Sequence, residues 1–185
     1  MPALKLRLNG KPVSVKLEAS STSEAGSYPA SLSLRCGGIG MQTETYVQKA
    51  LKLFDEGLSC AESVAQAGAQ GIGVENELIP RVATGFHGGL CASRSLCGAL
   101  AGAVIVLSAK YGRNDASGDK KVIDQKVRAL VNEFRTEFGS DNCYELTNTD
   151  FTAQISDEDR AKVRAGCRNF VSFCTRRALQ LCADD

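Results

Sequence analysis

The sequence lacks tryptophan, and only 6% of its residues are aromatic. Side chains on which nucleic-acid bases could stack are therefore scarce. The charges also balance, because 22 Lys and Arg face 21 Asp and Glu and leave a net charge of +1. Without a basic excess, the chain has no electrostatic reason to bind nucleic acid or an anionic membrane, and we expect neither as a partner.

A long apolar run is missing as well. The longest uncharged stretch covers residues 95–109, whereas about 20 apolar residues are needed to span a bilayer. We therefore expect no membrane span and interpret this stretch as a buried core helix. The N-terminal residues show no basic segment followed by an apolar run, so a secretory signal is not recognised and we expect a cytoplasmic protein.

Several functional motifs are absent. The sequence contains no Cys-x-x-Cys pair, which disfavours both a thioredoxin-like site and a zinc knuckle. It shows no phosphate-binding loop, no paired catalytic carboxylates and no Ser-His-Asp arrangement. The glycines of residues 85–89 follow no predicted strand, so they do not form a dinucleotide-binding fingerprint.

Cysteine, in contrast, is abundant, with eight in 185 residues. Without a secretory signal, eight cysteines argue against a purely structural disulfide framework. In a reducing compartment such residues serve as metal ligands, as redox thiols or as small hydrophobic side chains. The chain is long enough for one well-packed domain with a small appendage.

The N-terminal region predicts a β-hairpin arm over residues 1–18. Apolar and charged residues alternate on both sides of Asn9-Gly10, the dipeptide typical of a tight hairpin turn. Residues 19–42 are rich in small and polar residues and are predicted to be a linker. Because an isolated hairpin is marginally stable in water, we expect it to pack on the main domain or on a second chain, as in a homodimer.

Residues 43–185 are predicted to form a mostly α-helical bundle of five or six helices. Capping boxes are predicted at Thr45 with Gln48 and at Ser59 with Glu62, and Ser93 or Ser95 is predicted to cap the helix that continues to about residue 111. The clearest amphipathic helix covers residues 119–138. The last helical region begins at residue 156 and is predicted to break at Gly166.

Cys60, Cys97 and Cys143 each lie within one turn of a predicted helix start, and the break at Gly166 would give Cys167 the same position. A helix N-terminus carries partial positive charge and unpaired N–H groups, which favour thiolate over thiol. If these helix starts converge, they form an electropositive pocket suited to thiolates, to an anionic iron–sulfur cluster or to another anion. Cys97 is the candidate nucleophile.

The order Cys60, Cys97-Gly-Ala-x-x-Gly102, Cys143, Cys167 resembles the C_GCAxxG_C_C family, whose members are helical domains described as redox-active. Residues 83–89, residues 104–112 and the sequence that begins with Cys143-Tyr-Glu-Leu are also similar, so the resemblance covers about residues 43–182. It implies a redox role for the four cysteines and, from the family's transporter gene neighbourhoods, a redox or transporter-associated partner protein. Split-Soret cytochromes are similar too, but the chain has no Cys-x-x-Cys-His sequence and we expect no c-type haem.

Three classes of function stay open. The first is thiol/disulfide chemistry or electron transfer, and the second is an iron–sulfur cluster or another metal held by the same thiolates. The third is a helical adaptor that is not catalytic and whose cysteines only pack. The first two use the same four residues, Cys60, Cys97, Cys143 and Cys167.

Four further residues are candidates for binding a cofactor, and each has an alternative. His87 is either a ligand or proton carrier, or a hydrogen-bonded structural residue. Cys91 is either a resolving thiol or fifth ligand, or an ordinary loop cysteine. Gly98 and Gly102 either contact a cofactor through their backbone or allow close helix packing.

Overall fold

The computed structural model describes residues 4–8, 11–15 and 39–184. The chain divides into two units, residues 1–35 and 36–185, and each is described by itself. In the first unit, β1 (Leu4–Leu8) pairs with β2 (Lys11–Val15) in antiparallel register, with Leu6 opposite Val13. The predicted Asn9-Gly10 turn and most of the predicted linker lie outside the described residues, so the arm stays a prediction.

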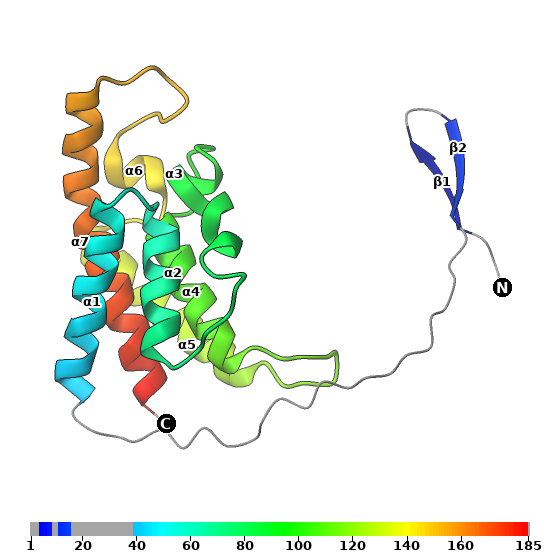
Figure 1. Cartoon of the computed structure of the whole chain (residues 1–185), viewed down its shortest axis with the longest axis horizontal. Helices are drawn as coiled ribbons and strands as arrows, with labels where there is room; N and C mark the ends of the chain where they lie inside the picture. The colour runs from blue at the N-terminus through cyan, green and yellow to red at the C-terminus, as the bar shows by residue number, and fades with distance from the viewer. Residues whose placement is uncertain (1–3, 9–10, 16–38, 185) are drawn as a thin grey trace. The chain divides into compact units, whose positions relative to one another are not determined.

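The second unit is helical (Figure 1). The prediction of a mostly α-helical protein is confirmed, but five or six helices is too few, because the described residues hold seven α-helices and one 3-10 helix, η1. The start of α6 at Cys143 was expected, whereas α3 was not, because its four residues are too few for hydrophobic periodicity to reveal. The elements are α1 (Ile39–Asp55), α2 (Cys60–Gly71), η1 (Arg81–Phe86), α3 (His87–Leu90), α4 (Gly98–Tyr111), α5 (Lys121–Phe138), α6 (Cys143–Thr147) and α7 (Asp157–Ala183).

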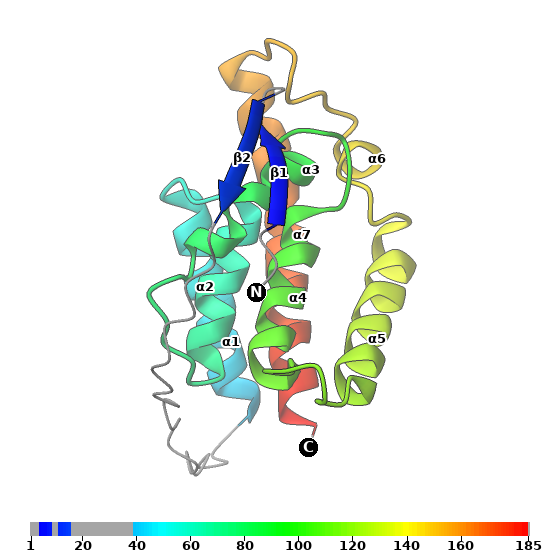
Figure 2. The same ribbon diagram turned by 90° about the vertical axis from the view of Figure 1, so that its right-hand side faces the viewer.

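Helices α1 and α5 run in the opposite direction to α2, α4 and α7 (Figures 1 and 2). Helices α2, α4 and α7 pack against one another, α1 packs on α2 and α7, and α5 packs on α4 and α7. Helices α2, α4 and α7 all begin at one end of the bundle, where α3 and α6 also lie (Figures 1 and 2). We call this the cysteine end, because it holds the residues of the candidate site.

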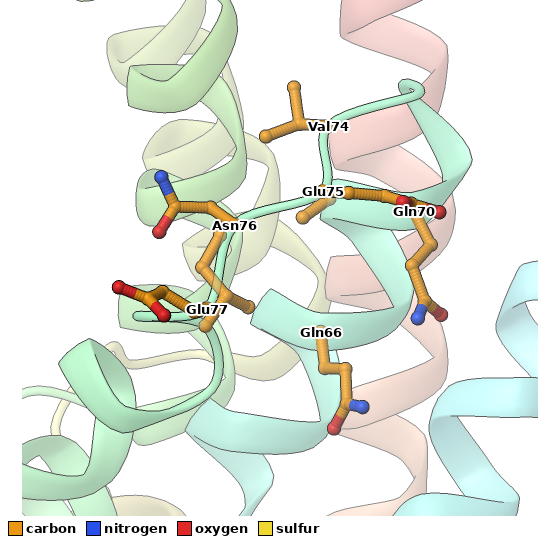
Figure 3. A pocket seen from close by; sticks show the side chains of 8 residues that line it. Gln66, Gln70, Val74, Glu75, Asn76 and Glu77 are labelled. Atoms are coloured by element: carbon orange, nitrogen blue, oxygen red, sulfur yellow. The ribbon is translucent and has the colours of Figure 1, made fainter.

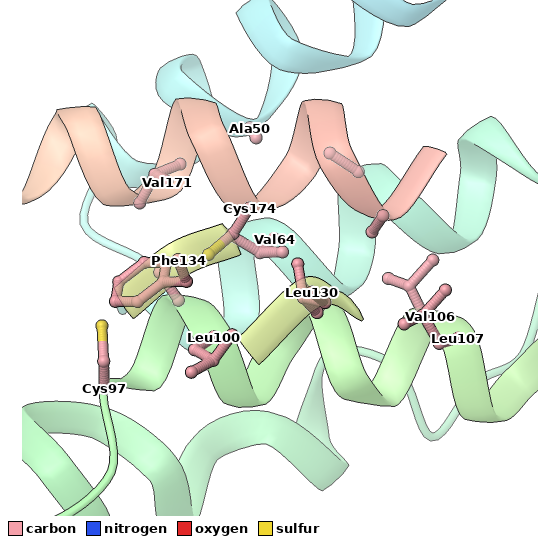
Figure 4. Packing of buried hydrophobic residues seen from close by; sticks show 14 of the residues in the cluster. Ala50, Val64, Cys97, Leu100, Val106, Leu107, Leu130, Phe134, Val171 and Cys174 are labelled. Atoms are coloured by element: carbon pink, nitrogen blue, oxygen red, sulfur yellow. The ribbon is translucent and has the colours of Figure 1, made fainter. Parts of the chain in front are cut away.

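The core lies between α1, α2, α4, α5 and α7 (Figure 4). Most of α4 is buried, which confirms the interpretation of residues 95–109 as a core segment. At Gly102 a Cβ would lie 2.5 Å from the Ala61 carbonyl oxygen, so glycine allows α4 to approach the α2 backbone closely. The largest fully buried side chains include Phe134, Leu100, Leu107, Leu130, Val64 and Val171.

Local signals located some helix starts and missed others. The Ser59 capping box is confirmed, since Ser59 N–H donates to Glu62 Oε2 at 2.8 Å and Glu62 N–H donates to Ser59 Oγ at 3.3 Å. The box at Thr45 and Gln48 is wrong, because α1 begins at Ile39 and both residues lie inside the helix.

The residue that caps α4 is Cys97, so the predicted caps Ser93 and Ser95 are wrong. The Ser95 backbone is engaged elsewhere, because its N–H donates to Gly89 and its carbonyl accepts from Cys143. The segment before Cys97 is therefore extended, and helical hydrogen bonding starts only after it.

The predicted break at Gly166 is also wrong, because α7 runs without interruption from Asp157 to Ala183. One glycine inside a helix costs only about 1 kcal/mol relative to alanine. The packing of α7 on α1, α2, α4, α5 and α6 outweighs that cost. No helix of the described residues is long and apolar enough to cross a membrane.

Candidate functional site

The structure brings the four predicted cysteines together at the cysteine end. Cys60 is the first residue of α2, Cys97 is the N-cap of α4 and Cys143 is the first residue of α6, as predicted. Cys167 instead lies inside α7, because that helix does not break. The Cys60 thiol interacts electrostatically with the other three, so the four side chains form one cluster.

A fifth cysteine, Cys174, lies next to this cluster. Its side chain is 0% exposed, and its thiol interacts electrostatically with those of Cys97 and Cys60. Figure 4 shows Cys174 and Cys97 beside Phe134 in the core. The available signal was its spacing of seven residues from Cys167, which is two turns along the same helix face. All cysteines within the described ranges are free thiols.

A β-bridge between Leu96 and Asn142 positions Cys97 and Cys143. Cys97 N–H donates to the Asp141 carbonyl at 2.8 Å, and Cys143 N–H donates to the Ser95 carbonyl at 2.7 Å. The bridge and its two hydrogen bonds thus hold the segments that carry Cys97 and Cys143 side by side.

Arg94 links the two segments that the β-bridge joins. Its guanidinium forms an ion pair with Asp150 and lies 5.0 Å from the centre of the Tyr144 ring. Its carbonyl accepts a hydrogen bond of 2.8 Å from Asn142 Nδ2. Hydrogen bonds from Arg94 and then from Thr152 hold the pKa of Asp150 well below its usual value, so the ion pair persists into acid solution.

The segment that leads into Cys97 contains a left-handed turn. Five consecutive residues, Gly88 to Ala92, have φ between +49° and +78°. Left-handed backbone is unfavourable for residues with a Cβ, by about 1–2 kcal/mol each, so this turn must be held by its surroundings. A Cβ at Gly89 would lie 2.7 Å from Cys143 Cβ, so glycine lets the turn approach the site closely.

Gly98 leaves room for the Cys60 thiol. A Cβ at this position would lie 2.6 Å from Cys60 Sγ and 2.7 Å from the Phe86 carbonyl oxygen. Gly102, one turn further, contacts the α2 backbone instead. Both glycines therefore have a packing role, and backbone contact with a cofactor stays a prediction.

A pocket of about 400 Å³ opens beside the cluster. Three of the four cysteines line it, Cys60, Cys143 and Cys167, whereas Cys97 does not. His87 also lines the pocket. Cys91 does not, because its exposed thiol donates to the Gly85 carbonyl at 3.3 Å. Sequence analysis missed the other lining residues, which are Phe54, Gly57, Ser59, Glu62, Gly88, Ala92, Phe151, Arg160, Val163 and Arg164.

A family model described as "Putative redox-active protein (C_GCAxxG_C_C)" matches residues 58–181, which is more than half of the chain. The chain belongs to the C_GCAxxG_C_C family. The match includes all four clustered cysteines and the complete pocket apart from Phe54 and Gly57, and it confirms the resemblance seen in the sequence. No curated protein and no solved structure matches the chain.

In this C_GCAxxG_C_C protein, burial opposes ionisation of the clustered thiols. Burial, together with the Cys97 thiol, raises the pKa of Cys143 from 9.0 to about 11. Burial raises the pKa of Cys167 to about 12, with further contributions from Cys97 and Cys143 and an opposing one from Arg164. The pKa of Cys60 is raised further by burial and by all three neighbours. The cluster is therefore neutral at physiological pH.

The N–H groups at the helix starts lower the pKa of the Cys97 and Cys60 thiols, but by less than burial raises it. Burial raises the pKa of Cys97, although the N–H groups of Leu100 and Ala99 favour its thiolate. The N–H of Ala61 has the same effect on Cys60. The expected stabilisation of thiolates by helix N-termini is thus present, but desolvation outweighs it.

Charged side chains surround the pocket. Arg164 donates to the Phe54 carbonyl, and its guanidinium carbon lies 4.0 Å from the centre of the Phe54 ring. Arg160 lies one turn earlier on α7. Burial would raise the pKa of Glu62, but hydrogen bonds from Thr84 and Ser59 lower it below the usual value, so Glu62 is ionised.

The residues that the structure describes offer no ready site for a single metal ion. Within residues 39–184 and the two strands, no group of three or more His, Cys, Asp or Glu side chains is positioned to hold one. A tetrahedral zinc site requires four ligand atoms at about 2.0–2.3 Å from the metal. The cysteine cluster would have to contract to form such a site.

A second pocket, of about 380 Å³, contains none of the predicted site residues (Figure 3). It lies along α2 and the segment that follows it, and is lined by Gln66, Gln70, Glu75, Asn76 and Glu77 among others. The side-chain oxygen of Gln70 is buried without a hydrogen-bond partner. None of its lining residues is a cysteine.

Proposed function

We propose that this protein carries out thiol/disulfide redox chemistry with the thiols that line the pocket, Cys60, Cys143 and Cys167. The supporting observation is that cysteines from three separate helices line one open cavity. A cysteine that only packs in the core does not need access to a cavity. Cys174, whose side chain is 0% exposed, is an example. The family's redox description agrees with this chemistry in general terms.

In the proposed reaction, a pocket thiolate attacks a disulfide and forms a mixed disulfide, which a second pocket thiol resolves. Two thiols together lose two protons and two electrons to the disulfide that is reduced. Cys143 is the attacking residue in this proposal, because its pKa of about 11 is raised less than that of Cys167 or Cys60. Cys97, the nucleophile expected from sequence, does not line the pocket.

An iron–sulfur cluster is the second candidate, and a different observation favours it. Four thiols on four elements match the ligand number of such clusters. The N–H groups that favour negative charge on Cys60 and Cys97 would stabilise an anionic centre. A bound cluster would supply one-electron transfer, with Cys60, Cys97, Cys143 and Cys167 as its ligands.

Anaerobic purification followed by elemental analysis and thiol titration separates these candidates. The proposed function predicts no stoichiometric iron or zinc, and two thiols that disappear on mild oxidation and return on reduction. Stoichiometric iron would contradict the proposed function and support the iron–sulfur cluster instead. If the protein contains no metal and loses no thiols reversibly, the helical adaptor is the function class that remains.

We also propose a reducing compartment such as the cytoplasm, because free thiols persist there. The partner in electron exchange would be a redox or transporter-associated protein, as the family resemblance implies. Co-purification from cells after trapping with a thiol-specific crosslinker tests this, and the Cys143→Ser variant is the matched control. Equal capture by both proteins would contradict a disulfide-linked partner.

A further inference from the structure

The arginines of α7 fall into two groups. Arg168, Arg176 and Arg177 form ion pairs with Asp55, Glu44 and Glu133, respectively. Arg160 and Arg164, which line the pocket, form no ion pair with any carboxylate of the described residues. Arg164 interacts instead with a carbonyl oxygen and an aromatic ring, and neither neutralises its charge.

The pocket therefore has an excess of positive charge. Glu62 is the one carboxylate among the lining residues, and its oxygens accept hydrogen bonds from Ser59 N–H at 2.8 Å and Thr84 Oγ1 at 2.6 Å. The lining thus holds two arginines and a single carboxylate, whose oxygens accept hydrogen bonds from the N-cap of its own helix and from η1. A cleft lined by one sign of charge concentrates ligands of the opposite sign.

Arginine has a specific geometry for such ligands. Its planar guanidinium pairs with a carboxylate through two parallel hydrogen bonds, which a lysine ammonium cannot form. The pocket volume of about 400 Å³ lies within the range of small-molecule sites. The same cavity holds three thiols, so an anion bound to the arginines lies beside sulfur nucleophiles.

We propose that the pocket binds a small disulfide that carries carboxylates, with the carboxylates on Arg160 and Arg164 and the sulfur–sulfur bond beside the pocket cysteines. This inference rests on the proposed thiol/disulfide function and names its substrate class. A low-molecular-weight peptide disulfide is the type of compound that meets both requirements.

The first step exchanges one disulfide bond for another. The sulfur of a pocket cysteine attacks one sulfur of the bound disulfide and forms a mixed disulfide. The original sulfur–sulfur bond breaks, and the second sulfur leaves as a thiolate that takes up the proton lost by the cysteine. The cysteine is oxidised and half of the small disulfide is reduced, so no further oxidant is needed.

The binding half of the proposal is tested without any redox step. S-methylglutathione carries carboxylates but cannot exchange, and its binding to the reduced, metal-free protein can be followed by calorimetry. We expect saturable binding that the Arg160→Gln/Arg164→Gln variant weakens at least about tenfold, the lower range for charge steering in a cleft. The Arg168→Gln/Arg176→Gln variant, altered on the same helix, should bind as the unmodified protein does.

The reaction half compares two disulfides of opposite charge, oxidised glutathione and cystamine. We expect the anionic compound to modify the pocket cysteines at least about tenfold faster at low salt, and the preference to disappear in the Arg160→Gln/Arg164→Gln variant. Mass mapping identifies the modified cysteine. Because Arg164 contacts Phe54, Arg160→Gln alone serves as a second variant if the double variant fails to fold.

The outcomes separate the two proposals. Exchange at equal rates with both disulfides, without binding of S-methylglutathione, overturns the anionic substrate and leaves the redox function standing. Arginine-dependent binding without any exchange overturns the redox function and leaves an anion site. Modification confined to the exposed Cys91 overturns both.

Discussion

The two halves of α7 use the same residue types in different ways. In the second half, the arginines are ion-paired, and Cys174 and Cys182 are buried in the core. In the first half, Arg168 pairs with Asp55, but Arg160 and Arg164 have no carboxylate partner in the described part of the chain, and Cys167 lines a pocket. Arginines and cysteines that support the fold are thus ion-paired or buried. Those that line the pocket stay accessible to a ligand.

The largest expected effect is that of alkaline pH on the reduced, metal-free protein. Burial raises the pKa of Cys143 to about 11 and that of Cys167 to about 12, from 9.0. Above about pH 9 the unfolded chain loses thiol protons that the folded chain retains, so the free energy of unfolding falls as pH rises. We expect stability to be complete below pH 9 and to decline toward pH 11–12, as measured by urea titration.

Lysine and tyrosine side chains titrate in the same range, so the Cys143→Ala variant is the control. The free energy of unfolding of this variant should decline less steeply above pH 9, because one thiol with a raised pKa is gone. Identical slopes for the two proteins would mean that Cys143 is not desolvated in the folded state.

The next effect separates a core cysteine from a pocket cysteine. Cys174→Ser introduces a hydroxyl into a fully buried position and should lower the free energy of unfolding by about 3 kcal/mol. Cys167→Ser, at a half-buried position beside the pocket, should cost less than about 1 kcal/mol but abolish or slow the redox step. Chemical denaturation with thiol titration measures both. A larger loss of stability in Cys167→Ser than in Cys174→Ser would contradict the distinction between the pocket cysteine and the core cysteine.

Two glycines provide a smaller contrast. Gly98→Ala inserts a methyl group 2.6 Å from Cys60 Sγ and should cost about 2 kcal/mol while displacing that thiol. Gly166→Ala lies in the exposed, uninterrupted part of α7, where a Cβ meets nothing within 4 Å. It should stabilise the protein by about 0.5–1 kcal/mol. Thermal unfolding of both variants tests this, and a destabilising Gly166→Ala would indicate that α7 does break there.

The smallest effects concern the arginines. Arg176→Gln removes an exposed ion pair with Glu44, which should lower the free energy of unfolding only slightly, because water and salt screen such pairs. Arg160→Gln removes no ion pair, so it should leave stability unchanged or improve it slightly. A clear loss of stability in Arg160→Gln would show that its charge already has a structural partner.

Much of the helical framework could be predicted from sequence. The amphipathic pattern of residues 119–138 matches α5 within two residues, and the Ser59 box located the start of α2 and hence Cys60. The sequence motif Ser140-Asp-Asn-Cys143 likewise located α6, with Asn142 as its cap. These signals are local, so a single sequence contains them.

The rest depends on contacts between distant segments. The left-handed turn at residues 88–92 contains Leu90, Cys91 and Ala92, which do not favour that conformation, so nothing local predicts it. The pairing of Arg168 with Asp55, and the absence of such a partner for Arg160 among the described residues, follow only from how α7 packs on α1. The packing among α2, α4, α6 and α7 gathers the cysteines, so their order along the chain was visible but their pocket was not.

The most direct test of the account is to map which cysteines oxidise reversibly in the reduced, metal-free protein. Differential alkylation before and after mild oxidation, read by mass spectrometry, assigns each thiol. The account predicts reversible oxidation of two among Cys60, Cys143 and Cys167, while Cys174 and Cys182 stay reduced. Oxidation restricted to Cys91, or none that a reductant reverses, would contradict it.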